Sequence, residues 1–599
     1  MEQILQHYET ELDYMRRAFQ EFEKSYPQKA KSLGISAGRS SDPDVQRLAD
    51  SLALHAARLS KRLDDTLPET ALDLIRILAP TFLLGAPSYT AVKLDPGTDA
   101  LAEKTVLAAG TEMPVTIKGD RPSCRFSTAR DVTLHPITVK SVRLERAPFR
   151  FSAPESLVGC ETAICVTLAS LDAGQPLAEV GINALELYVS AEGARKQRLI
   201  DVLSGEVFGV GYGETGAERS TKSVTNFLSS DSFALSMTEE TRTFLPREKT
   251  EMEALARLRD FLAYPDKAAF FTLSDTDKSF AKHEGSEVEL RFFLSNQGAQ
   301  QIKELSDGDL SVNVVPTLNL YLDQSRPARY DFTRLQVPVK PETSADMDVD
   351  CLQIRSVRKL TSEGEQLLPC ITSGQRRDTG GVPVWQERYQ TGEFDAARRE
   401  ISFSTFEGQG SDPEPLDFVA SMYCSNGRAA FAPRPGTQVF FNSDALAECP
   451  FYLIDEPSAP IAPDVKIDRL WDVLSMIDGN FATIFDSSSP SERLRETLHL
   501  SAPSGYADAA NAIWDVKVTQ SIAPIRVGRN MLLSAGSQIE VVLDVDALPF
   551  ARHVFANALH FFFAAMISYD RFFQLKLRER GKEKPFKVFP RQHGGQICG

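Results

Sequence analysis

One serine lies in a pattern that is found at the nucleophile of many hydrolases. Gly34, Ser36 and Gly38 match Gly-x-Ser-x-Gly, in which the serine hydroxyl attacks a carbonyl from a sharp turn between a strand and a helix. That geometry needs a buried strand directly before the serine. The residues that precede it here, Pro27 to Leu33, have a helical pattern instead. We therefore expect a loop between helices at this position, and keep hydrolysis by Ser36 only as an alternative function.

A second pattern has the glycine spacing of a dinucleotide-binding loop. Gly211, Gly213 and Gly216 match Gly-x-Gly-x-x-Gly, whose glycines should open an apolar-faced helix that receives a pyrophosphate at its N-terminus. The residues that follow, 217–226, are polar and show no helical face. We expect a flexible loop here and predict no cofactor.

Residues that could ligate a metal ion or carry acid–base chemistry are dispersed. His553 and His560 lie two helical turns apart, too far to share one metal without further ligands, so we predict core or interface histidines. Asp64 and Asp65 are adjacent, but such pairs arise by chance in a chain with 82 acidic residues, and a solvated helix end explains them. The 8 cysteines form no Cys-x-x-Cys pair, so neither a zinc site nor a disulfide framework is indicated. The sequence therefore predicts no catalytic residue, no metal and no enzyme.

The composition is that of a large folded protein with an acidic surface. Of the 599 residues, 42% are hydrophobic and 25% charged, and a chain of this length divides into several domains. A net charge of −16 without a basic block opposes binding to nucleic acid or anionic lipid. The longest apolar run, Ala558 to Ile567, is too short to span a bilayer, and the N-terminus lacks a signal-peptide pattern. We expect a cytoplasmic protein with no nucleic acid, no direct membrane insertion and no small-molecule substrate.

The first 26 residues carry apolar side chains at alternating spacings of three and four, which we call the N-terminal seam. Its members are Leu5, Tyr8, Leu12, Met15, Phe19, Phe22 and Tyr26. This stripe is narrower than the face that a globular helix turns to its own core, and it suits knobs-into-holes packing against another helix. Burying these side chains yields very roughly 10–20 kcal/mol, while ordering the backbone costs about 1–2 kcal/mol per residue. The helix should therefore need a partner helix, in this chain or in another.

The rest of the pattern predicts a multidomain α+β protein, with a helical N-terminal region followed by β-rich mixed domains. Asp42 and Pro43 should begin a second helix, and a third helix should cover 69–78. One face of the second helix should carry Val45, Leu48, Ala49, Leu52, Ala56, Leu59 and Leu63. From Pro87 the period changes to two, as in segments that should form half-buried strands. The predicted strands include 185–189, 288–294, 539–545 and 573–577; the predicted helices include 252–261, 490–498 with a capping box at Ser489, and 550–567.

We predict four parts in the chain. Residues 1–85 form a helical N-terminal region that is a candidate for docking of partner helices, and residues 86–350 form a β-rich domain with an inserted helix near 248–263. Residues 351–500 form a mixed α+β middle domain with long loops, and residues 501–599 form a C-terminal α+β domain.

Sequence blocks spread over nearly the whole chain resemble one known family. The longest is SDPDVQRLADSLALHAARLSKRLDDTLPETALDLIRILAPTFLLGAPS, from Ser41 to Ser88, and further blocks follow in the same order at 246–271, 313–321, 353–357, 467–480 and 568–581. Together they resemble TssF, also called ImpG or VasA, of the type VI secretion baseplate. The segment Ala79 to Leu83 is less aromatic than is usual in that family, and the glycine-rich middle has few matching positions.

The resemblance implies a non-enzymatic wedge subunit of a bacterial baseplate, on which a contractile sheath and inner tube are built. It implies partners as well: TssG, a second copy of this chain, TssK and TssE, in a cytoplasmic assembly docked to the inner-membrane complex. The N-terminal seam fits this reading independently, because phage-like wedges are held together by bundles of helices. A wedge protein of a contractile phage tail or of a phage-derived injection particle is the alternative.

Overall fold

The structure is a computed structural model of the chain. It describes residues 2–95, 101–117, 123–151, 160–172, 174–214, 225–228, 232–238, 243–246, 251–276, 280, 285–345, 347–371, 382–391, 397–404, 414–463, 467–477, 484–485, 489–503, 508–527, 530–567 and 571–593. Within these ranges, the backbone alone is described for 2–6, 61–69, 388–391, 397–398, 467–468, 508, 525–527 and 530–532.

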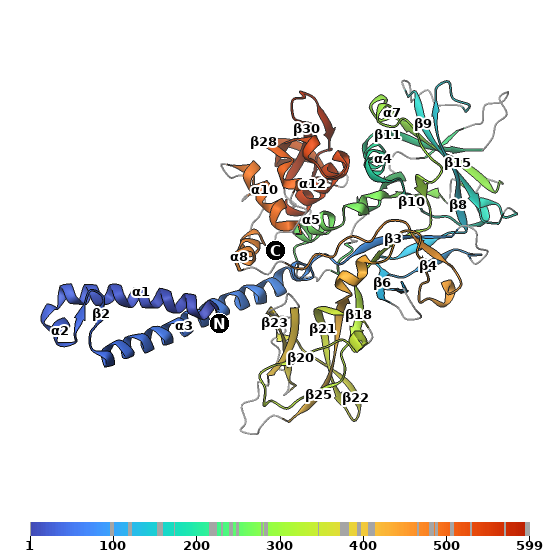
Figure 1. The fold of residues 1–599 in the computed structure, drawn as a ribbon. Helices are drawn as coiled ribbons and strands as arrows, with labels where there is room; N and C mark the ends of the chain where they lie inside the picture. The colour runs from blue at the N-terminus through green and yellow to red at the C-terminus, as the bar shows by residue number, and fades with distance from the viewer. Residues whose placement is uncertain are drawn as a thin grey trace. The chain divides into compact units, whose positions relative to one another are not determined.

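The chain divides into two compact units. Unit 1 comprises Met1–Arg76 with Val465–Leu474, and unit 2 comprises Ile77–Asp464 with Ser475–Gly599. Unit 1 is mainly helical, whereas unit 2 combines many sheets with helices (Figure 1). The predicted α+β class with a helical N-terminal region is therefore confirmed. The predicted division into four parts stays a prediction.

Unit 1 contains a helical hairpin. Its elements are α1 (Glu2–Ser25), α2 (Pro27–Ser32), the small antiparallel pair β1 (Ile35–Ser36) and β2 (Arg39–Ser40), and α3 (Pro43–Leu78); α8 (Ile467–Ile477) begins in the second segment of this unit. As predicted, Asp42 caps α3, because its Oδ1 accepts a hydrogen bond of 2.9 Å from the backbone N–H of Asp44.

The helix α3 corrects one expectation from the sequence. Two helices with a break before residue 69 were expected, but α3 is one helix of 36 residues that runs through Pro68. An interior proline costs about 3 kcal/mol, since one backbone hydrogen bond is lost and the ring crowds the preceding turn. Both halves of α3 have buried side chains, such as Ala53 in the first and Ile75 in the second, and this packing offsets the cost.

One antiparallel sheet of unit 2 joins strands from distant segments in the order β26-β27-β3-β17-β6-β5. Its strands are β26 (Gln438–Val439), β27 (Phe451–Leu453), β3 (Tyr89–Leu94), β17 (Val314–Leu318), β6 (Cys124–Thr128) and β5 (Glu112–Val115). The pair β4 (Thr105–Leu107) and β7 (Val132–Leu134) shares its hydrophobic core.

Two further sheets of unit 2 share one hydrophobic core with helices. The first, in order, is β12 (Asn226–Phe227), β11 (Val207–Gly213), β15 (Glu287–Leu294), β9 (Thr162–Ser170) and β8 (Ile137–Arg146). The second is β13 (Phe233–Leu235), β14 (Phe270–Leu273), β10 (Leu185–Val189) and β16 (Leu310–Ser311). The described helices of unit 2 include α4 (Gly193–Gly205), α5 (Glu253–Ala263), α7 (Asn296–Gln301), α10 (Pro490–Ser501), α11 (Asp508–Asn511) and α12 (Arg552–Met566).

Two sheets from the middle of the chain pack on one core. They are β18 (Tyr321–Gln324), β25 (Leu416–Ser425), β21 (Asp350–Thr361) and β22 (Gly364–Leu368), with β19 (Ala328–Tyr330) also on β25, and β20 (Val337–Pro338), β24 (Ala397–Ser404) and β23 (Val384–Thr391). Side chains from both, such as Phe418 and Phe403, belong to the same buried cluster, as expected for a sandwich.

The C-terminal sheet has the order β28-β29-β30-β31. Its strands are β28 (Ile513–Val527), β29 (Asn530–Leu543), β30 (Phe572–Glu579) and β31 (Pro585–Val588), with β32 (Gln592–His593) also on β30. The β29–β30 pair is parallel, and α12 is the crossover between them. The largest hydrophobic core of unit 2 combines α4, α5, α12, this sheet and the sheets around β15 and β10. Phe261 of α5 and Phe550 before α12, for example, meet edge to face at 5.0 Å.

Some predicted elements are right in place but wrong in detail. The strand at 288–294 exists as β15, but it is buried on both faces rather than half-buried, because Glu289 and Arg291 pair at 2.9 Å and so can leave water together. The helix after Ser489 begins at Pro490 as expected, yet the backbone of Ser489 is not in the extended conformation of an N-cap, and its side chain forms no cap hydrogen bond. The strand expected to reach Val545 ends at Leu543.

Candidate partner-binding surface

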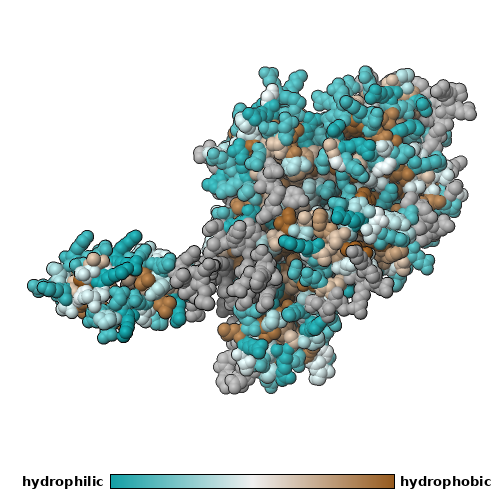
Figure 2. All heavy atoms as spheres, viewed as in Figure 1, coloured by the Kyte–Doolittle hydropathy of each residue, from teal (hydrophilic) through white to brown (hydrophobic). Residues whose placement is uncertain are grey.

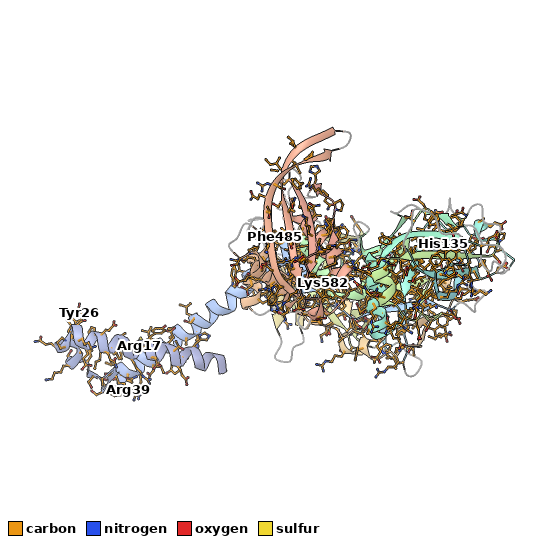
Figure 3. The ribbon with its side chains drawn as sticks, turned by 90° about the horizontal axis from the view of Figure 1, so that it is seen from above. Arg17, Tyr26, Arg39, His135, Phe485 and Lys582 are labelled. Carbon is orange, nitrogen blue, oxygen red and sulfur yellow. The ribbon has the colours of Figure 1, made fainter. Side chains whose placement is uncertain are left out.

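The N-terminal seam lies along α1, with its last member just past the end of that helix. Tyr8, Leu12, Met15, Phe19 and Phe22 are all half-buried, while the side chain of Leu5 lies outside the described residues. Tyr26 is exposed and stands 5.5 Å from the ring of Phe22, at the end of the hairpin where α1 meets α2 (Figure 3).

Helix α3 of the same chain lies beside α1. The two helices run side by side in both views (Figures 1 and 3), and Ser60 of α3 donates a hydrogen bond of 2.9 Å to Glu11 of α1. Ala49, Ala53 and Ala57 are spaced by four along α3, and they form a buried face of small side chains on this helix. The hairpin thus places a second helix of the same chain beside α1, and the binding of a partner helix by the seam side chains stays a prediction.

The turn of the hairpin is docked on α1. Gly38 has a φ of +79°, and a Cβ there would lie 3.0 Å from the backbone oxygen of Arg16, so the position suits only glycine. The backbone N–H of Ala37, whose φ is also positive, donates to Glu23 at 3.1 Å. These contacts fix where α3 starts relative to α1.

A second apolar face of α3 is exposed among the described residues, and apolar side chains are visible between the hydrophilic ones of this unit in Figure 2. Leu48, Leu52 and Leu59 are 73%, 57% and 62% exposed, and we call these residues the leucine stripe. The expected place of these leucines on one face with Ala49 is wrong, because their spacing of four and seven sets them on a different side of the helix from the buried alanines. The signal that separates the faces was present in the sequence, since the leucines keep a heptad spacing and the alanines a spacing of four.

The catalytic patterns do not form sites. A loop was expected at Ser36, but this residue lies in β1 of the β1–β2 hairpin, where it is exposed and where α2 precedes it in the chain. Gly211 and Gly213 lie in β11, which pairs with β15, so they do not open a helix; Gly216 lies outside the described residues. A Cβ on Gly211 would meet Thr225 at 2.5 Å, so this glycine serves close packing of strands.

The two histidines of α12 are both buried. His553 is buried against Asp201, and His560 is buried with its ring stacked 4.0 Å from that of Phe589, so both are core histidines. The side chains of Asp64 and Asp65 lie outside the described residues. Among the residues that the structure describes there is no group of three or more His, Cys, Asp or Glu side chains that could hold a metal ion. The described cysteines are all thiols, and Cys598 lies outside the described residues.

The whole chain matches one protein family. The sequence profile described as type VI secretion system, TssF, covers residues 1–596. The chain belongs to the TssF family. This match decides between the secretion-system and phage alternatives that the sequence left open, in favour of the secretion system. No helix in the described part of this TssF chain is both long and apolar enough to cross a membrane.

Known relatives of this TssF chain share its length and its fold. It is 24% identical to the type VI secretion system component TssF1 of Pseudomonas aeruginosa over 629 aligned positions, which cover 98% of each chain. Its fold is similar to a chain in the cryo-electron microscopy structure of a TssK–TssF–TssG baseplate subcomplex, with a TM-score of 0.71 and 19% identity over 92% of this chain and 100% of that one. A chain of another type VI baseplate complex covers 99% of it with a TM-score of 0.57 and 18% identity.

Proposed function

We propose that this chain is a structural subunit of the type VI secretion baseplate that assembles with TssG, with a second copy of itself, with TssK and with TssE, and that it carries out no reaction. Membership in the TssF family and the likeness of the fold to chains of solved baseplate assemblies support this proposal. The single observation that carries it is the leucine stripe of α3, a heptad face with no covering helix among the described residues of unit 1.

The leucine stripe is suited to receive a helix from another subunit. Each leucine that passes from water into a helix interface contributes about 1.5–3 kcal/mol, so the three side chains together can drive a specific contact. The hairpin brings its own partner for the N-terminal seam, so a third helix on the leucine stripe would complete a small bundle. In this proposal the seam residues support binding indirectly, because they hold α3 in place. Seam residues close to the leucine stripe also contact the incoming helix.

The subunit acts as a passive part of the machine in this proposal. The assembly is cytoplasmic and docks to the inner-membrane complex, and the contacts between wedges rearrange when contraction is triggered. Each contact needs only modest stability, because symmetric repetition makes the assembly cooperative.

Co-expression with TssG tests the proposal. The wild-type chain should elute together with TssG from a sizing column, with two copies of this chain for each TssG by light scattering. The double variant Leu52→Asp with Leu59→Asp should lose this co-elution, since two charges on the stripe oppose burial. A matched control is Leu335→Asp with Leu367→Asp, two leucines of unit 2 that are 88% and 65% exposed. The proposal is contradicted if the stripe variant still binds TssG, or if the wild-type chain never co-elutes with it. If the control variant loses binding to the same extent, the added charges act non-specifically, and this result also counts against the proposal.

A further inference from the structure

The two longest strands of the C-terminal sheet extend past their neighbours. β28 and β29 pair from Ile513 with Leu543 to Val527 with Asn530, whereas β30 joins β29 only from Gly536 onward. The distal parts of β28 and β29 therefore form a two-stranded ribbon, seen as the faint red strands that run beyond the sheet in Figure 3. A ribbon of two strands is only marginally stable in water without packing on one of its faces.

In the body of this sheet, one face is covered by α12. Cross-strand rows such as Val541 with Leu577, and Ile539 with Leu575, are fully buried on this inner face. α12 supplies the cover: the ring of His560 lies 5.2 Å from that of Phe573, and Arg552 pairs with Glu579 at the other end of β30. The sheet and the helix form the two-layer packing that buries an apolar sheet face.

The same inner face continues along the ribbon, where its apolar side chains are exposed among the residues that the structure describes. Because side chains alternate between faces, Ile522 and Pro524 lie on the same side of β28 as the buried Val516. Their register partners on β29 are Ala535 and Leu533, so four apolar side chains share one face. Ile522 and Leu533 are 76% and 78% exposed.

The opposite face of the ribbon is different. Ala523 is buried there beside Phe572, whose ring lies so close to Gly536 that a Cβ on this glycine would meet it at 2.4 Å. The small side chains of this face are therefore accommodated by the chain itself, whereas the large aliphatic side chains point to the uncovered side. Selection for solubility alone would favour the reverse arrangement.

We propose that an amphipathic helix of another baseplate subunit packs on the inner face of the β28–β29 ribbon, in line with α12 and continuing its layer. A helix is the expected occupant because the inner face of the ribbon continues the sheet face that α12 covers. Pairing with an edge strand would satisfy backbone groups but leave Ile522 and Leu533 exposed. A second copy of the ribbon would offer only four side chains, whereas a stable dimer buries about 800 Å² per partner. The inference rests on the proposed function only in that the helix comes from the same assembly.

Photo-crosslinking in the assembled complex tests the position of the helix. Benzoylphenylalanine replaces Leu533, the complex is irradiated, and the crosslinked peptides are mapped by mass spectrometry. The crosslinks should fall on one helix of another subunit, at apolar residues spaced by three and four. The same residue placed at Leu367, an exposed leucine of β22, is the control and should not reach that helix. Crosslinks to a second ribbon, to a strand edge or to residues 594–599 of the same chain overturn the proposal, as does the absence of any crosslink in a complex that contains this chain.

A charge variant separates this inference from the proposed function. Ile522→Lys with Leu533→Lys should keep the melting temperature of the isolated chain, because both side chains are exposed there. It should weaken binding of the crosslinked subunit by about tenfold or more, since two aliphatic side chains can no longer be buried. The leucine stripe remains intact in this variant, so contacts made through the hairpin should persist. Unchanged binding of the crosslinked subunit refutes the ribbon contact, whatever the hairpin does.

Discussion

The imidazole Nδ1 of His553 lies 3.0 Å from Oδ1 of Asp201, and the backbone N–H of His553 donates to the same carboxylate oxygen at 3.0 Å. This contact fastens the start of α12 to α4, so it joins segments of unit 2 that lie some 350 residues apart in the sequence. Burial by itself would raise the pKa of Asp201, but the hydrogen bonds and charge of His553, with the charge of Arg552, outweigh it and hold that pKa below its usual value.

The close approach of α12 to α4 depends on Gly205. A Cβ at this position would lie 2.1–2.4 Å from ring atoms of His553, and the ring has no free space because it is buried. We expect Gly205→Ala to destabilise unit 2 by about 1–3 kcal/mol through overpacking, although alanine is the better helix former. The denaturant midpoint measures this. Gly308→Ala is the control, since nothing lies within 4 Å of a Cβ there, and an equal effect of both substitutions would refute the steric explanation.

A second buried histidine should make stability depend on pH. Burial, with a smaller contribution from the charge of Lys587, lowers the pKa of His560 to about 4. Between pH 6.5 and 4 the unfolded chain therefore binds a proton that the folded chain does not, and stability falls as the pH falls. We expect wild type to lose about 2 kcal/mol more than His560→Phe between pH 7 and pH 5. Denaturant unfolding at both pH values measures this difference; parallel pH profiles of the two proteins would contradict it.

The thiols of the sheets should be unreactive in the folded protein. Burial raises the pKa of Cys124, Cys165 and Cys351 to about 12 and raises that of Cys424 as well. Because the thiolate is the reactive form, we expect iodoacetamide at pH 8 to spare these residues in the native chain and to modify them after unfolding. Cys370 is only half-buried and should react sooner. Alkylation followed by peptide mass spectrometry checks this; rapid native labelling of Cys351 would show that the sandwich core opens.

Local patterns were enough to place many elements, but not to say what covers them. The alternation at 185–189 and 288–294 identified β10 and β15, because period two is a property of the strand itself. The same alternation predicted a solvent-exposed face on β15, but Arg291 on this face is buried. Its guanidinium stacks 4.2 Å from the centre of the Phe151 ring and pairs with Glu289. The burial of this face depends on segments distant in the sequence, so a period cannot reveal it.

At the candidate site too, the sequence indicates local helix and strand patterns but not which segments cover them. The heptad spacing of the N-terminal seam predicts a partner helix, and this stays a prediction. The expected apolar face of the second helix did not separate the buried alanine face of α3, formed by Ala49, Ala53 and Ala57, from the leucine stripe. The ribbon at Ile522 went unnoticed, because its exposure follows from the length of β30 and not from any pattern within β28.

The two faces of the hairpin can be separated by substitution. Leu12→Asp with Met15→Asp places two charges in the half-buried seam against α3, so we expect the hairpin to lose about 2–5 kcal/mol and its helicity, while unit 2 stays folded. Hydrogen exchange over residues 7–57 measures the hairpin, and co-elution with TssG measures binding. The seam variant should lose both the slow hydrogen exchange of the hairpin and the binding to TssG. The variant Leu52→Asp with Leu59→Asp should lose binding but keep slow exchange, because the stripe is exposed in the free chain. Slow exchange with lost binding in the seam variant would instead mean that the seam contacts another subunit directly, and intact binding in that variant would remove the seam from the interface altogether.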